Sequence, residues 1–150
     1  MNDAGPDQPI DGRFDGREHR FAVRVYFEDT DLSGMVYHAN YLRFMERGRS
    51  DMLRLAGIDQ RAAIAAGAGA YAITRLDIRY HRPARLDDAL VVASRLHRLR
   101  AASLVIHQRV IRADDLLAEA TVTVALVAAD GRPRRLPPAW RAAFEPMIWA

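Results

Sequence analysis

The chain has 150 residues, a length that suits a single domain with a buried core. Its 22 basic and 19 acidic residues give a formal net charge of +3, which is too small to indicate nucleic-acid binding. The absence of cysteine excludes disulfides, thiolate metal sites and a cysteine nucleophile, and it fits a cytoplasmic location. No run of about 18 apolar residues occurs, so no membrane span is predicted.

The first residues are polar and acidic, and they lack the apolar run and basic start of a signal peptide. We interpret residues 1–16 as a disordered leader and residues 17–150 as one domain. Alternation of apolar and polar residues then predicts a first strand over 21–27, with Phe21, Val23, Val25 and Phe27 on one face.

The strongest amphipathic pattern covers 41–56, where apolar residues recur at helical spacing. Asn40 stands at the expected N-cap, and Gly57 followed by Ile58 is typical of a helix C-terminus. The start of this helix places backbone N–H groups around 38–41 at its positive end, where an oxyanion is stabilised.

Four further strands are predicted after a loop that holds one helical turn at 61–66. They cover 71–81, 88–98, 103–112 and 116–129. A change of alternation indicates a bulge near Thr74 or Arg75, and Pro137 and Pro138 open a short C-terminal helix. The last three strands have short connections and form an antiparallel meander. The pattern therefore predicts an α+β fold, with an antiparallel sheet of about five strands wrapped around one long central helix.

The polar residues gather between the first strand and the helix. Asp29 and Asp31 are two residues apart, and His38 follows Asp31 by seven. Taken alone, aspartates in a turn commonly bond to nearby backbone, and a histidine at a helix start is commonly satisfied by backbone or water. No histidine has ligand spacing with another, and no serine lies in a G-x-S-x-G setting, so neither a metal site nor a serine triad is predicted.

The segment 23–58 resembles the hot-dog acyl-CoA thioesterases of the 4-hydroxybenzoyl-CoA thioesterase superfamily. It reads VRVYFEDTDLSGMVYHANYLRFMERGRSDMLRLAGI. Within that superfamily it is most similar to the Tol–Pal-associated (YbgC-type) subgroup, on the motif D-T-D-x-x-G-x-V-Y-H-A-N-Y. The later strands agree in length and order, so the likeness covers about 20–138. It implies the hot-dog fold, which the element pattern favours independently.

The resemblance also implies roles for the residues of this motif. Asp31 takes the place of the catalytic general base or nucleophile, and Asp29 the place of a residue that holds the loop. The backbone N–H of His38 is expected to polarise the thioester carbonyl, and its imidazole to contact substrate. Tyr37 and Asn40 are expected to contact substrate as well.

Three features of the sequence leave alternatives open. Many members of the subgroup carry tyrosine where this chain has Phe27, which puts any step assisted by that hydroxyl in doubt. Some hot-dog thioesterases place their carboxylate on the long helix, so Glu46 is a second candidate for the base. The cluster Arg132, Arg134 and Arg135 is either a solvated tail or a contact for coenzyme A phosphates.

The predicted function is hydrolysis of acyl-CoA, with coenzyme A as part of the substrate and no metal or other cofactor. An acyl carrier protein is a possible partner, and apolar sheet edges predict a homodimer or homotetramer. The main alternative is a non-catalytic module that binds acyl-CoA or acyl carrier protein and serves cell-envelope maintenance. A hot-dog dehydratase or hydratase is a further alternative, although its catalytic motifs are not found.

Overall fold

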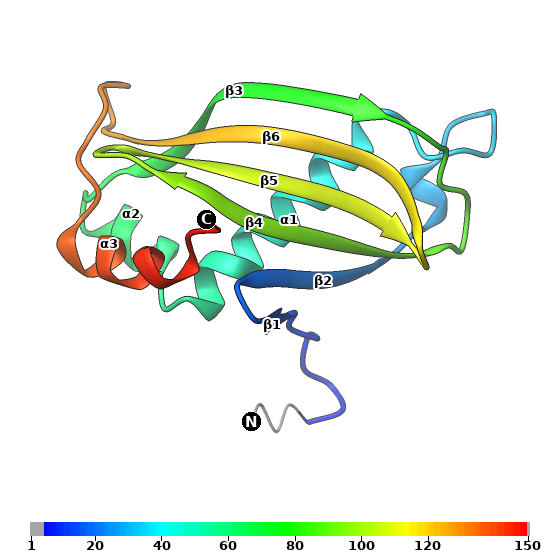
Figure 1. Ribbon diagram of the computed structural model, residues 1–150, viewed down its shortest axis with the longest axis horizontal. Coiled ribbons are helices and arrows are strands. Elements are labelled where there is room, and N and C mark those ends of the chain that lie inside the picture. The colour runs from blue at the N-terminus through cyan, green and yellow to red at the C-terminus, as the bar shows by residue number, and fades with distance from the viewer. Residues whose placement is uncertain (1–4, 150) are drawn as a thin grey trace.

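The computed structural model describes residues 5–149 as one antiparallel sheet with helices. The elements are β1 (Arg13–Asp15), β2 (Glu18–Arg24), η1 (Phe27–Asp29), α1 (Asn40–Leu55), α2 (Gln60–Ala65), β3 (Ala70–Tyr80), β4 (Ala89–Leu99), β5 (Ser103–Arg112), β6 (Asp115–Val127), α3 (Pro138–Phe144) and η2 (Glu145–Met147). The strand order is β1-β2-β4-β5-β6-β3. Figure 1 shows α1 crossing one face of this sheet. The predicted hot-dog α+β architecture is therefore confirmed.

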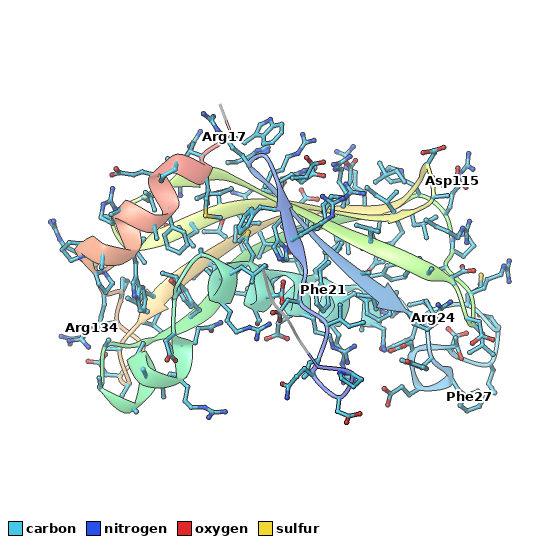
Figure 2. The ribbon with its side chains drawn as sticks, turned by 90° about the horizontal axis from the view of Figure 1, so that it is seen from below. Arg17, Phe21, Arg24, Phe27, Asp115 and Arg134 are labelled. Atoms are coloured by element: carbon cyan, nitrogen blue, oxygen red, sulfur yellow. The ribbon has the colours of Figure 1, made fainter. Side chains whose placement is uncertain are left out.

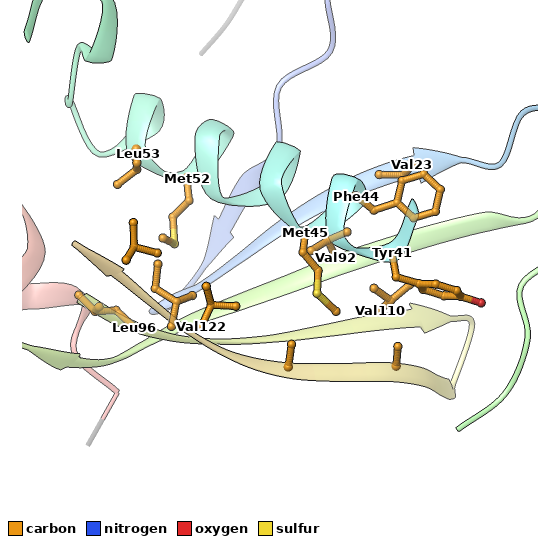
Figure 3. Close-up of a cluster of buried hydrophobic side chains, with 14 of the residues drawn as sticks. Val23, Tyr41, Phe44, Met45, Met52, Leu53, Val92, Leu96, Val110 and Val122 are labelled. Carbon is orange, nitrogen blue, oxygen red and sulfur yellow. The ribbon is translucent and has the colours of Figure 1, made fainter. Parts of the chain in front are cut away.

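The core forms where the apolar face of α1 packs on β2, β4 and β5. Phe44, Met45 and Met52 on the helix are almost completely buried, and Figure 3 shows them pointing at the sheet. Full burial of such side chains stabilises the fold by roughly 1.5–3 kcal/mol each. Gly48 lets the helix approach β4, because a Cβ there would lie 2.9 Å from Val92 Cγ1.

The end of α1 and the bulge agree with the sequence prediction. Gly57 has a φ of +90°, and its N–H donates to the Arg54 carbonyl at 3.0 Å. The Ile58 N–H reaches back to the Leu53 carbonyl at 2.9 Å, which completes a Schellman motif. The register of β3 against β6 shifts between Ile73 and Arg75, at the predicted bulge.

The sheet has six strands where about five were predicted. The additional strand, β1, falls within the segment expected to be a disordered leader and pairs with β2. Gly16 makes this hairpin possible because its φ of +60° suits a tight turn. The part of the leader prediction that concerns residues 1–4 lies outside the described residues.

The first predicted strand ends earlier than expected. Strand β2 stops at Arg24, and the chain then turns through η1. Phe27, expected to share the buried face of the strand, is instead 83% exposed. The turn forms because the Tyr26 N–H donates to Asp29 Oδ2 at 2.8 Å, which draws the chain out of the extended conformation.

Candidate active site

Asp29 is a buried carboxylate that organises the loop between η1 and α1. Besides accepting from the Tyr26 N–H, it accepts a hydrogen bond from Asn40 Nδ2 through Oδ1 at 2.9 Å. Its own carbonyl accepts from the Tyr37 N–H at 2.9 Å. One residue thus connects both ends of the loop to the first turn of α1, as expected for a structural aspartate.

Asn40 does not cap the helix as predicted. It is the first residue of α1, preceded by Ala39, and no side-chain cap bond forms there. Its buried amide donates to Asp29 because that carboxylate lies beside the helix start and requires partners. The structure therefore gives Asn40 a role in holding the loop.

Asp31 lies at the exposed tip of the same loop. Its Oδ1 accepts from the Ser33 hydroxyl and from the Ser33 N–H, the latter at 2.8 Å. These two hydrogen bonds, the hydroxyl first, lower the pKa of the Asp31 carboxyl, and the nearby His38 adds a smaller electrostatic effect. Within residues 5–149 no group donates to Oδ2. The loop thus presents an ionised carboxylate with one oxygen unoccupied.

The residues Tyr37 to Asn40 form a turn that leads into α1. The Asn40 N–H donates to the Tyr37 carbonyl at 2.8 Å, which leaves His38 and Ala39 at the centre of the turn. In the described part of the chain, the backbone N–H groups of these two residues reach no acceptor. They lie at the positive end of the helix, so they are suited to bind an oxyanion. Tyr37 and His38 are both exposed, and the centroids of their rings lie 4.5 Å apart.

The other predicted residues lie away from this loop. Glu46 is exposed on α1, about 9 Å along the helix axis from Asn40 at about 1.5 Å per residue. Arg134 donates to the Gly67 carbonyl, and Arg132 Nε lies 3.7 Å from Asp130 Oδ2. Figure 2 shows Arg134 and Phe27 at opposite ends of the molecule. Within one protomer, the arginine cluster and Asp31 therefore do not meet.

The span between these two ends follows from the register of β6. Tyr80, at the Asp31 end, pairs with Ala118, whereas the Arg134 N–H donates to the Leu126 carbonyl at 2.8 Å. Eight residues separate Ala118 and Leu126, which corresponds to about 27 Å of strand at about 3.4 Å per residue.

Two residues at the site were missed at the sequence level. Ser33 carries a recognisable signal, because Asp-x-Ser is a common turn pattern in which the aspartate accepts from the residue two further on. Tyr80 carries none. Its hydroxyl donates to the His38 carbonyl at 2.7 Å across 42 residues of sequence, a contact that only the folded chain creates.

A cavity beside α1 does not coincide with this loop. It has a volume of about 1070 Å³ and lies along the outer face of α1, between the segment around Ile10 and the start of α2. Neither Asp31 nor His38 lines it, so the site is identified from its polar groups and not from a cavity.

Within residues 5–149, none of the helices has the length and apolar character needed to cross a membrane. The same residues contain no group of three or more acidic or histidine side chains that could hold a metal ion.

An ionised aspartate on the loop that enters a helix N-terminus suits attack on an activated carbonyl. This loop on a hot-dog sheet defines a domain of the thioesterase class. The sequence matches the family described as the thioesterase-like superfamily over residues 25–144, and the chain belongs to that superfamily. The resemblance inferred from the motif is thereby confirmed.

Its relatives cover most of the chain. It is 42% identical over 128 residues to the acyl-CoA thioester hydrolase YbgC of Escherichia coli, which is 84% of this chain and 95% of that protein. It is 41% identical over 107 residues to the acyl-CoA thioesterase YbgC of Haemophilus influenzae, covering 71% of this chain and 79% of that one. The crystal structure of a probable thioesterase from Bartonella henselae superposes with a TM-score of 0.76 at 40% identity, over 80% of this chain and 99% of that one.

Proposed function

We propose that this chain hydrolyses acyl-CoA thioesters to the free acid and coenzyme A, with Asp31 acting on the thioester carbonyl. The observation that carries the proposal is the ionised Asp31 carboxylate with Oδ2 unoccupied, on the loop that leads into the N-terminus of α1. The names of the YbgC relatives, acyl-CoA thioester hydrolase and acyl-CoA thioesterase, support the same reaction.

The proposed reaction can follow two routes from the same geometry. In the first, Asp31 takes a proton from water as the water oxygen bonds to the carbonyl carbon. In the second, Asp31 itself attacks that carbon, and water then cleaves the resulting mixed anhydride. In both routes the carbonyl oxygen becomes an oxyanion at the N–H groups of His38 and Ala39, and the carbon–sulfur bond breaks as the coenzyme A thiolate leaves. Neither proposed route uses a metal or any cofactor besides the coenzyme A of the substrate.

We also propose that the active form is a homodimer joined along β3. This strand has eleven residues and, within the described part of the chain, pairs only with β6, so its outer edge is open in one protomer. Ile73 and Leu76 on it are large apolar side chains that remain exposed. A two-fold pairing of two β3 strands is antiparallel, and it places opposite ends of the two sheets together.

Such a dimer keeps a role for the arginine cluster. The Arg132, Arg134 and Arg135 side chains of a second copy would lie on the same side as Asp31 of the first copy, where they would contact coenzyme A phosphates. Replacing all three with glutamine should raise KM and weaken its dependence on salt, with little change in kcat. An unchanged KM would mean that the cluster is a solvated tail.

A cytoplasmic location, delivery of acyl groups by an acyl carrier protein and a link to the Tol–Pal system belong to the same proposal.

The test is thiol release measured across a series of acyl-CoA chain lengths. Asp31→Asn should lower kcat by about 10²–10⁴-fold, the range of general-base catalysis, while substrate still binds. The matched control is Asp114→Asn, which changes an equally exposed carboxylate in the β5–β6 turn and should leave the rate unchanged. Acyl-CoA binding without thiol release by the unaltered protein would contradict the proposal and support a non-catalytic binding module.

A further inference from the structure

Tyr80 holds the centre of the turn that enters α1. It is the last residue of β3, and its hydroxyl donates to the His38 carbonyl at 2.7 Å. Among the described residues, no other side chain donates to the backbone of Tyr37, His38 or Ala39. Within residues 5–149, the sheet therefore reaches the proposed oxyanion site through this one side-chain hydrogen bond.

The Tyr80 ring is held in place by aromatic neighbours. It meets the Tyr41 ring edge-on, with centroids 5.4 Å apart, and the His38 ring edge-on at 6.5 Å. Tyr41 is itself fixed, because its hydroxyl accepts a hydrogen bond from the Ala84 N–H at 2.9 Å. Partial burial raises the pKa of Tyr80, so the phenol remains a protonated donor at neutral pH.

We propose that Tyr80 is a positioning residue for catalysis, which fixes the direction of the oxyanion-binding N–H groups; this inference rests on the function proposed above. The Tyr80 hydrogen bond prevents the His38 carbonyl from rotating, and the two peptide groups that flank His38 are fixed with it. A hydrogen bond to a peptide carbonyl also polarises the N–H of the same peptide, which here belongs to Ala39.

This role predicts which kinetic constant should change. N–H donors that point at the developing oxyanion stabilise the transition state and have little effect on the binding of the thioester substrate. Small errors in the position of catalytic groups reduce the rate strongly. Loss of the Tyr80 hydroxyl should therefore lower kcat and leave KM nearly constant.

The experiment compares Tyr80→Phe with Tyr71→Phe. Tyr71 lies near the other end of β3, and its hydroxyl is buried without a hydrogen-bond partner among the described residues. It thus provides the same change on the same strand without loss of a bond. We expect Tyr80→Phe to lower kcat about tenfold, because the N–H donors remain but lose their alignment. Tyr71→Phe should be kinetically silent.

A second measurement separates positioning from support of the fold or from substrate contact. A trifluoromethyl ketone analogue of acyl-CoA, which hydrates to a tetrahedral adduct, should lose affinity in Tyr80→Phe by the same factor as kcat. A thioether analogue, which resembles the bound substrate, should bind as before. A raised KM with unchanged kcat would overturn the proposal, because it would mean that the hydroxyl binds substrate. Unchanged kcat and KM would overturn it as well.

An NMR measurement separates this inference from the proposed function. The backbone amide signals of His38 and Ala39 should shift in Tyr80→Phe and stay in place in Tyr71→Phe, whether or not thiol is released. If the unaltered protein hydrolyses no acyl-CoA, the proposed function fails while the amide shifts still decide on positioning. Amide signals that do not move would overturn the role of Tyr80 even in an active thioesterase.

Discussion

Two aspartate–histidine combinations lie along α1, one at its N-terminus and one near its C-terminus, and they differ in burial and in the hydrogen bonds of the carboxylate. Asp31 and His38, at the start of the helix, are exposed, and one oxygen of Asp31 is unoccupied. Asp51 and His19, further along, are buried, and both oxygens of Asp51 are engaged. The same residue types thus give the proposed reactive group where a carboxylate oxygen remains available, and a structural group where both oxygens are engaged.

The partners of Asp51 show what the buried combination stabilises. Its Oδ2 lies 2.6 Å from His19 Nε2 and accepts from the Gly12 N–H at 2.9 Å, while Oδ1 accepts from Arg54 at 2.9 Å. A Cβ on Gly12 would lie 2.5 Å from the Arg20 carbonyl oxygen, so only glycine fits this approach. The pair therefore fastens the segment before β1 against the helix.

The largest effect on stability is expected from Asp51→Ala. Both ring nitrogens of the buried His19 would then lack a partner, since Nδ1 has none among the described residues already. Removing the partner of a buried polar group costs about 1–3 kcal/mol, which urea denaturation should detect as a lower free energy of unfolding. A loss under about 1 kcal/mol would show that the pair does not hold this segment.

The buried pair also predicts sensitivity to acid. Burial lowers the pKa of His19 despite the opposing effect of Asp51, so the imidazole stays neutral to lower pH in the folded protein than in the unfolded chain. The unfolded chain takes up this proton near pH 6.5, so stability should fall as the pH drops through that value. The melting temperature of the unaltered protein should therefore fall relative to that of His19→Gln as the pH is lowered through this range. Identical pH dependence in both proteins would exclude His19 as the cause.

At the exposed combination, His38→Ala distinguishes the backbone from the imidazole. Alanine still supplies the N–H at this position, so kcat should remain within about threefold if only the backbone acts on the oxyanion. A loss of about a hundredfold, as for a missing catalytic group, would instead show that the imidazole contacts substrate or Asp31.

The smallest effect is expected from Ser33→Ala, and it should appear only in acid. The Ser33 hydroxyl is the main cause of the lowered pKa of Asp31, so its removal should raise that pKa. Because the proposed mechanism requires Asp31 in its ionised form, the acid limb of kcat/KM should move to higher pH while the rate at neutral pH is kept. An acid limb that does not move would mean that another group controls it.

Local patterns predicted the parts of this molecule that local interactions determine. The apolar face of α1, the Gly57–Ile58 C-terminus and the bulge near Arg75 depend on neighbouring residues, and the structure confirms them. The resemblance supplied Asp31, which composition and spacing alone did not separate from Asp29. Burial separates the two, and burial is decided by the folded chain.

The features that were missed depend on contacts distant in sequence. Asn40 has the residue type of an N-cap, but its amide is taken by the buried Asp29, eleven residues away. Tyr80 reaches His38 across 42 residues. The β1–β2 hairpin was missed because residues 1–16 were expected to be disordered; β1 is held partly by the Gly12 N–H, which donates to Asp51 on the helix.

The most direct test of the account is kcat for thiol release by Asp31→Asn, measured beside Asp51→Asn with the folded fraction of each protein determined. We predict that Asp31→Asn keeps its free energy of unfolding and loses about 10²–10⁴-fold in kcat, whereas Asp51→Asn loses stability and keeps kcat per folded molecule. If Asp31→Asn releases thiol as fast as the unaltered protein, Asp31 is not the catalytic carboxylate, and Glu46 becomes the next carboxylate to replace.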